Sequence, residues 1–238
     1  MNYNQIFNED CLTGMKKLPE GILNTTFTSP PFNKKGLYGK KGVGNQIWQK
    51  HEIDYDEYGD NMTEAQYLKW QHEILEELYR ITKKDGSLFY HHKNRRHKNI
   101  CHTPFKFFEN TSWKLYQIIF LDRKNSPNIR NDILVPTSEY IFWLVKEKPK
   151  VFRKNLPKEF ISEIWKVPPV RQVDGHPAPS HPDLPKNTIL LTTEENDLVF
   201  DPFSGIGTTC LTAKELGRNY LGFEISENYY TISKSKGL

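Results

Sequence analysis

Residues 201–209 read DPFSGIGTT, and this segment sets the expected class of fold. An apolar run, Leu198–Phe200, precedes it, and a helical pattern from Thr208 to Leu216 follows it. Gly205 and Gly207 allow a sharp turn and a close approach of the backbone to a ligand, and the following helix offers free N–H groups at its N-terminus. Taken alone, two spaced glycines also fit a plain turn between a strand and a helix.

The residues after the turn narrow the choice of ligand. Cys210 occupies the place of the third glycine of a dinucleotide-binding fingerprint, and no lysine follows the glycines as it does in a P-loop. Glu224 ends the next predicted strand, where a carboxylate can accept hydrogen bonds from both hydroxyls of a ribose. The pattern therefore describes a nucleoside cofactor without a phosphate near the turn. S-adenosyl-L-methionine meets this description, and NAD meets it less well.

A second motif follows a predicted strand near the N-terminus. The strand Leu23–Thr28 is rich in β-branched residues and ends at the sequence SPPF, because prolines cannot donate a ladder hydrogen bond. The carboxyl ends of strands in an open α/β sheet form the ligand crevice. We therefore expect residues 29–32, called here the SPPF corner, to lie beside residues 201–209, called here the glycine turn. Ser29 Oγ and the Pro30 carbonyl are suited to accept the two hydrogens of an amino group, while Phe32 stacks on its ring. If the two prolines are considered alone, the simpler interpretation is that they only end the strand.

The remaining pattern alternates strands with helices. Thr63 and Gln66 form a capping-box pattern that begins a helix reaching about Ile81, and Asp85-Gly86 predicts a turn into a strand. The further predicted elements are strands at Ser87–Tyr90, Leu115–Leu121 and Tyr140–Val145, a short helix beyond Leu184, and a terminal helix. The proline-rich stretch from Pro149 to His181 predicts an irregular insertion in an α/β domain.

Composition excludes several classes of protein. The 238 residues, 37% of them hydrophobic, fit one domain, or one domain with an insertion, and the mean hydropathy of −0.70 predicts long polar loops. No run approaches the roughly 20 apolar residues of a membrane helix, and the first residues lack the pattern of a signal peptide. Cys11, Cys101 and Cys210 form no CxxC pair, which argues against a disulfide framework or a zinc site and fits a reducing cytoplasm.

The two motifs, and their order along the chain with SPPF before DPFSGIGTT, resemble those of amino-group DNA methyltransferases of the permuted β group. In that group the catalytic motif precedes the cofactor motif. The similarity spans nearly the whole chain. It implies a doubly wound, mostly parallel seven-stranded sheet of the class I methyltransferase type. Residues 1–148 would carry the catalytic motif and a long basic loop at 33–60, residues 149–180 a target-recognition insert, and residues 181–238 the cofactor motif.

The resemblance also assigns residues to the site. Residues 8–11 resemble the segment that reaches the cofactor's adenine, residues 181–186 the element beside its methionine, and residues 222–224 the ribose-binding acid. The catalytic residues implied are Ser29, Pro30, Pro31 and Phe32. The cofactor-binding residues implied are Asp10, Cys11, Lys186, Asp201, Pro202, Phe203, Ser204, Gly205, Gly207, Thr208, Thr209 and Glu224.

The implied reaction is methyl transfer from S-adenosyl-L-methionine to an exocyclic amino group of a base rotated out of double-stranded DNA. A serine at the first position of the catalytic tetrapeptide resembles cytosine-N4 enzymes most, whereas aspartate predominates in adenine-N6 enzymes. We therefore predict cytosine N4, with adenine N6 as the alternative, in a restriction-modification setting. Positioning and electrostatics are expected to drive the step, without a metal or a covalent enzyme intermediate. A cognate restriction endonuclease and a homodimer are the further candidate partners.

Basic clusters predict where DNA is held, although a net charge of +4 is mild. One cluster lies in the loop at 33–60, a second in residues 91–98, and a third in the insert. The predicted DNA-binding residues are Lys34, Lys35, Lys40, Lys41, Lys93, Arg95, Arg96, Arg153, Lys154 and Arg171. The histidines of residues 91–98 are expected at the surface or beside a phosphate. A solvated charged face explains such clusters equally well.

Three other functions fit part of the pattern. They are a nucleic-acid-binding module with a vestigial cofactor site, an NAD-dependent oxidoreductase, and an RNA or protein-glutamine methyltransferase. The methyltransferase interpretation requires one geometry: the SPPF corner and the glycine turn must face each other at the same edge of the sheet.

Overall fold

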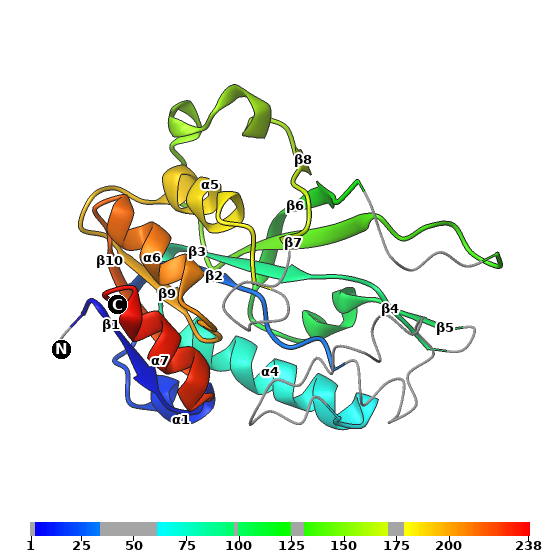
Figure 1. The fold of residues 1–238 in the computed structure, drawn as a ribbon, viewed down its shortest axis with the longest axis horizontal. Helices are drawn as coiled ribbons and strands as arrows, with labels where there is room; N and C mark the ends of the chain where they lie inside the picture. The colour runs from blue at the N-terminus through cyan, green and yellow to red at the C-terminus, as the bar shows by residue number, and fades with distance from the viewer. Residues whose placement is uncertain (1–2, 34–60, 98–99, 125–130, 171–178) are drawn as a thin grey trace.

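A computed structural model describes residues 3–33, 61–97, 100–124, 131–170 and 179–238, and it shows an α/β fold built on an eight-stranded sheet (Figure 1). The strands follow the order β1 (Gln5–Asn8), β10 (Asn219–Glu224), β9 (Leu198–Asp201), β2 (Leu23–Thr28), β3 (Thr82–His92), β7 (Ser138–Val145), β6 (Lys114–Asp122), β8 (Ile164–Lys166). Only β7 runs antiparallel to its neighbours in this sheet. The predicted doubly wound, mostly parallel sheet is confirmed, with β8 as an eighth strand.

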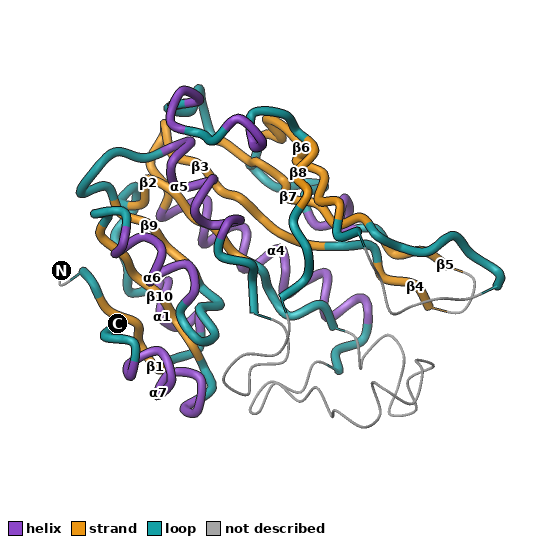
Figure 2. Tube along the Cα trace, turned by 45° about the horizontal axis from the view of Figure 1, so that its top comes forward, coloured by secondary structure: helices purple, strands orange, loops and turns teal. Residues whose placement is uncertain are grey.

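Helices cover both faces of the sheet (Figure 2). One face carries α1 (Cys11–Lys16) and α4 (Glu64–Ile81), which pack against each other, and the other carries α5 (Asp183–Thr192), α6 (Thr208–Glu215) and α7 (Glu227–Ser235). The remaining short elements are the hairpin of β4 (Arg95–His97) and β5 (Ile100–His102) and the 3₁₀ turns η1 (Pro104–Phe107), η2 (Arg153–Asn155) and η3 (Lys158–Phe160). None of the helices in the described part of the chain has the length and apolar character of a membrane-spanning segment.

The order of the strands reverses between β9 and β2. From β9 the chain passes through α6 to β10 on one side, and from β2 it passes through α4 to β3 on the other side. The two strands are parallel neighbours, with Thr25 beside Val199 and Thr26 beside Phe200. In open α/β sheets ligands bind outside the carboxyl ends of the strands at such a reversal. Both sequence motifs begin there.

The helix α4 forms as its sequence predicts. The Thr63 side chain accepts from the Gln66 N–H, and the Gln66 side chain accepts from the Thr63 N–H, so the capping box is complete. Its buried side chains recur at helical spacing and pack on the sheet: Tyr67, Gln71, Ile74, Leu75, Leu78 and Ile81. The helix is thereby fixed against β2 and β3 close to the SPPF corner.

The predicted turn at Asp85-Gly86 is wrong, because β3 runs without interruption from Thr82 to His92. The register between β2 and β3 shifts here, and a Cβ at Gly86 would lie only 2.9 Å from the Leu23 carbonyl oxygen. The glycine lies in an irregular part of the β2–β3 ladder where two backbones approach closely, and β3 does not reverse direction there.

The predicted insert has no separate core in its described part. β8 lies parallel to β6 at the sheet edge, and Trp165, only 2% exposed, packs in the same cluster as Ile119 and Leu184. Because β7 is antiparallel, the chain leaves it at the edge of the sheet where the parallel strands begin. The strand β8 brings the chain back to the edge where the parallel strands end, and α5 begins there.

Candidate active site

A buried carboxylate joins the two motifs. Thr28 at the end of β2 donates its hydroxyl to Asp201 at the end of β9, with 2.9 Å between Oγ1 and Oδ1. The other oxygen of Asp201 accepts from the Thr209 hydroxyl at 2.7 Å, and the Phe203 N–H donates to Oδ1 at 3.0 Å. The SPPF corner and the glycine turn therefore lie at one edge of the sheet, as the sequence predicts.

The pKa of Asp201 is determined mainly by its burial. Burial raises the pKa of its carboxyl to about 6, against the opposing effect of hydrogen bonds from Thr209, Phe203 and Thr28. These three donors hold the side chain in one orientation, so Asp201 fixes the spacing between the two motifs.

The glycine turn has the backbone conformation that its sequence requires. Gly205 has a φ of 53° and Gly207 a φ of 84°, both in the left-handed region that glycine adopts without a steric penalty. Ser204 donates its hydroxyl to the Asp201 carbonyl at 2.9 Å, and α6 starts directly after Gly207 at Thr208. Pro202 is buried, and the half-buried ring of Phe203 packs edge-on against Trp70, with 5.5 Å between ring centroids.

Glu224 closes the turn from the neighbouring strand β10. One oxygen of its carboxylate accepts from the Gly205 N–H at 2.7 Å and the other from the Ser226 N–H at 2.9 Å. Burial raises the pKa of Glu224 to about 7, although these two backbone hydrogen bonds act in the opposite direction. A carboxylate has about four acceptor positions, so it retains capacity for ligand hydroxyls.

The predicted adenine-side segment lies beside Glu224. The Asn8 amide donates to the backbone carbonyls of Glu224 and Ile225 at 2.9 and 3.1 Å. Asp10 caps α1 by accepting from the Thr13 N–H at 2.9 Å, and Cys11 is buried, which raises the pKa of its thiol. Lys186, by contrast, is exposed near the start of α5.

Two elements hold the SPPF corner. Ser29, half-buried, places its Oγ 3.1 Å from Nδ1 of His91 on β3. The carbonyl of Pro31 accepts from the Tyr67 hydroxyl of α4 at 2.6 Å. The ring of Phe32 lies against that of His92, with centroids 4.5 Å apart, and Lys93 Nζ lies 5.5 Å from the centroid of Phe32. The corner is thus fixed at both ends, and Pro30 between them is buried.

The structure corrects the prediction for the histidines of residues 91–98. His91 and His92 are buried, because β3 extends two residues beyond the predicted end at Tyr90 and stays paired with β7 there. Burial holds the pKa of His92 well below its ordinary value, and its Nε2 lies 3.0 Å from the Tyr67 hydroxyl. Both rings belong to the support of the corner rather than to the surface.

Arg95 also differs from the prediction. Its guanidinium forms two hydrogen bonds to Glu64, at 2.9 and 2.6 Å, and lies 4.7 Å from the centroid of the Tyr67 ring. Only 3% of the residue is exposed, so Arg95 does not fit the predicted contact with a phosphate. An ion pair to α4 and an aromatic face satisfy the charge inside the protein instead.

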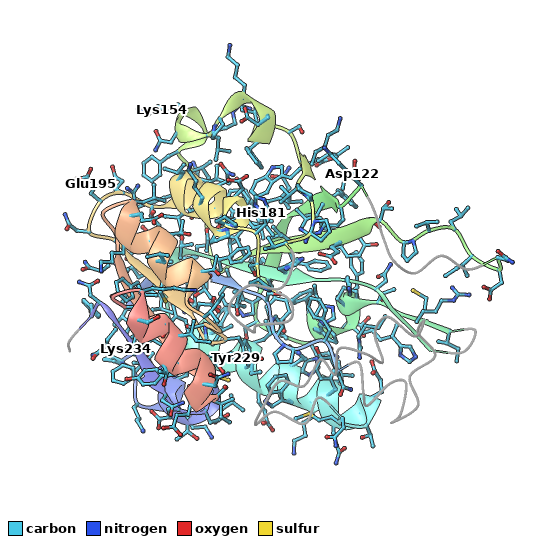
Figure 3. The ribbon with its side chains drawn as sticks, viewed as in Figure 1. Asp122, Lys154, His181, Glu195, Tyr229 and Lys234 are labelled. Carbon is cyan, nitrogen blue, oxygen red and sulfur yellow. The ribbon has the colours of Figure 1, made fainter. Side chains whose placement is uncertain are left out.

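The other predicted DNA contacts are scattered. Arg96 is half-buried in the short strand β4. Arg153 and Lys154 are exposed on η2, next to the C-terminal end of α5, where the Phe152 N–H donates to the Leu191 carbonyl at 2.7 Å. This is the edge of the sheet opposite the corner, and Figure 3 shows Lys154 at the outer end of the insert, with His181 nearer the middle of the molecule. Lys34, Lys35, Lys40, Lys41 and Arg171 lie outside the described residues.

Sequence reasoning missed several supports of the site. Tyr67, which binds the Pro31 carbonyl, and Glu139, which contacts His91, come from a helix and a strand far from both motifs in the sequence. Thr28, which binds Asp201, has no sequence feature that indicates this role beyond its place at the end of a strand. Glu139 directly precedes the predicted strand Tyr140–Val145. Knowing that this strand is antiparallel would have placed Glu139 at the ligand edge.

Comparisons with known proteins identify the family of the chain. Residues 23–235 match a family model described as DNA methylase, N6_N4_Mtase. The chain is 28% identical to the type II methyltransferase M2.MboI of Moraxella bovis over 249 residues, covering 99% of this chain and 87% of that protein.

Two solved structures share the fold. PvuII DNA methyltransferase (cytosine-N4-specific) aligns with a TM-score of 0.78 and 20% identity over 100% of this chain and 90% of its own. The M1.HpyAVI–SAM complex aligns with a TM-score of 0.62 and 23% identity over 98% of each chain. Because the family model covers most of its length, including both motifs and the strands that carry them, the chain belongs to the N6/N4 amino-group DNA methyltransferase family.

Proposed function

We propose that the chain transfers a methyl group from S-adenosyl-L-methionine to N4 of a cytosine rotated out of double-stranded DNA, in a restriction-modification setting. The observation that supports this proposal most directly is the hydrogen bond between Thr28 and Asp201, which links the SPPF corner, the proposed amine site, to the glycine turn, the proposed nucleoside site. Such proximity is the main requirement of a direct transfer between two bound groups.

The residues of the turn fit the proposed cofactor. Residues 201–209 contain no lysine or arginine, which suits a ligand without a phosphate there. Glu224 would accept from the ribose hydroxyls, Asp10 and Cys11 would lie toward the adenine, and the turn at Gly205 would face the methionine portion. When bound, S-adenosyl-L-methionine supplies an electrophilic methyl group on a positively charged sulfur.

The corner would bind the amine through its two hydrogens. Ser29 Oγ is one acceptor, and the Pro30 carbonyl is the proposed second, because the Pro31 carbonyl is already bonded to Tyr67. Two such hydrogen bonds draw electron density onto the amino nitrogen and restrict its rotation, so its lone pair can point at the methyl group. Phe32 would stack on the base.

Cytosine is proposed over adenine because the tetrapeptide begins with Ser29. Adenine N6 remains the second candidate, since the family model covers both kinds of enzyme and both bases present a flat ring with a conjugated amino group. The geometry of the corner serves either amine.

Nucleoside analysis of methylated DNA tests the proposal. Genomic DNA from a host without these modifications is incubated with the protein and isotope-labelled S-adenosyl-L-methionine, digested, and analysed by mass spectrometry. We expect label in N4-methyldeoxycytidine. Label in N6-methyldeoxyadenosine would move the proposal to adenine, and unlabelled DNA would overturn it. Ser29→Ala should bind the cofactor but transfer no methyl.

A further inference from the structure

A chain of three side chains leads away from Ser29. Its Oγ lies 3.1 Å from Nδ1 of His91, and Nε2 of the same ring lies 2.9 Å from Oε2 of Glu139. His91 comes from the carboxyl end of β3, and Glu139 from the beginning of the antiparallel strand β7. The side chains of His91 and Glu139 are 7% and 16% exposed, so little water competes for these contacts. Neither residue belongs to the two motifs.

Charges around Glu139 keep it ionised. Burial alone raises the pKa of a carboxyl, but the hydrogen bond from His91 and the surrounding positive charges, those of Lys93 and Arg123 among them, outweigh it, so the pKa of Glu139 lies well below its ordinary value. Lys93 Nζ is 3.6 Å from one carboxylate oxygen, and Arg123 Nε is 3.4 Å from the other.

An ionised Glu139 determines which nitrogen of His91 carries the proton. A carboxylate can only accept, so the hydrogen of the neutral ring must be on Nε2, and Nδ1 is then an acceptor. The Ser29 hydroxyl consequently donates to Nδ1, and the lone pairs of Oγ are free to accept from another group. With the opposite tautomer, Nδ1–H would donate to Oγ and occupy one of those lone pairs.

We propose that His91 and Glu139 are positioning residues that fix Ser29 as an acceptor for the target amine and provide the route by which the amine's proton leaves. This proposal rests on the proposed function. The occupant of the corner is an exocyclic amino group that must lose one proton for each methyl that it gains.

The proton transfers balance in charge and atoms. The lone pair of the amino nitrogen forms the new N–C bond as the C–S bond breaks, which moves the positive charge from sulfur to nitrogen and leaves a neutral thioether. The nitrogen then gives a proton to Ser29 Oγ, while the Ser29 hydroxyl gives its own proton to His91 Nδ1. The resulting imidazolium is stabilised by Glu139 and returns to neutrality by releasing one proton to water.

The tautomer of His91 can be measured without DNA or cofactor. In ¹⁵N-histidine-labelled protein, long-range ¹H–¹⁵N correlation spectra distinguish a protonated ring nitrogen from an unprotonated one, with His91→Asn used to assign the signals. We expect the neutral ring to carry its proton on Nε2. A neutral ring protonated on Nδ1 would overturn the proposal, and this holds whether or not the protein methylates DNA.

Kinetics test the role in turnover. Glu139→Gln keeps the size of the side chain but removes the charge, and it should lower the single-turnover methylation rate by about 100-fold or more, while cofactor affinity changes by less than about twofold. The matched control is Glu147→Gln, which removes an exposed carboxylate just beyond the other end of β7. A Glu139→Gln rate within about threefold of wild type would overturn the proposal. Absence of methylation by the wild type would instead overturn the proposed function, and the tautomer measurement would still decide the geometry.

Discussion

Thr26 and Thr28 lie two positions apart on β2, and both are fully buried. Thr28 donates to Asp201, whereas Thr26 Oγ1 has no hydrogen-bond partner among the described residues. Thr28→Val should lower the free energy of unfolding by about 1–3 kcal/mol, because it leaves a buried carboxylate short of a donor. Thr26→Val should be neutral or stabilising, because it replaces an unpaired hydroxyl with a methyl group. Urea unfolding measures both changes, and an equal loss in the two variants would contradict the role of Thr28.

Glu224 should make stability depend on pH. Its folded pKa of about 7 lies above the ordinary value of 4.5, so the folded protein holds this proton more tightly than the unfolded chain. The stabilisation is complete below pH 4.5 and is lost as the pH rises through 7, a change of up to about 3 kcal/mol. Relative to Glu224→Gln, the wild type should lose this amount between pH 4.5 and 7.5 in urea titrations. If the free energies of unfolding of the wild type and Glu224→Gln change in the same way with pH, the raised pKa of Glu224 is contradicted.

The helix α4 supports the corner as well as the core. The Tyr67 hydroxyl is its direct link to the Pro31 carbonyl. Tyr67→Phe keeps the ring and removes this donor, which should cost about 1–2 kcal/mol of stability and lower the methylation rate, because the corner is less well fixed. Tyr79→Phe, on the same helix but packed against Trp113, is the control. Stability and rate are measured for both variants, and a Tyr67→Phe enzyme as fast as the control would contradict the link.

Elements with a local signal could be predicted from the sequence. The strand β2 was predicted with its observed ends, and α4 begins at its predicted capping box, because β-branching, prolines and caps act within a few residues. β1, α1 and the β4–β5 hairpin are short, and each contacts an element distant in sequence: β1 pairs with β10, α1 packs against α4, and Arg95 of the hairpin pairs with Glu64 of α4. The buried states of His91 and Arg95 likewise depend on β7 and α4, which no local pattern brings beside them.

Ligand binding should stabilise the whole molecule. The proposed cofactor site draws on β1, β9 and β10, which lie together in the sheet, so binding is coupled to folding of that sheet. A ligand present at 100 times its dissociation constant adds about 2.7 kcal/mol. For a chain of this size, that corresponds to a rise in Tm of about 5–10 °C. Calorimetry with S-adenosyl-L-methionine measures the rise, and an unchanged Tm for a protein shown to bind the cofactor would contradict this coupling.

The reversal of strand order between β9 and β2 places the two motifs side by side, and the proposed chemistry depends on this arrangement. A crystal structure with bound S-adenosyl-L-methionine would locate the reactive methyl group. We expect the ribose hydroxyls on Glu224 and the methyl group facing the Ser29–Phe32 corner across the Thr28–Asp201 hydrogen bond. A cofactor bound away from Glu224, or with its methyl group directed away from that corner, would contradict methyl transfer at this site.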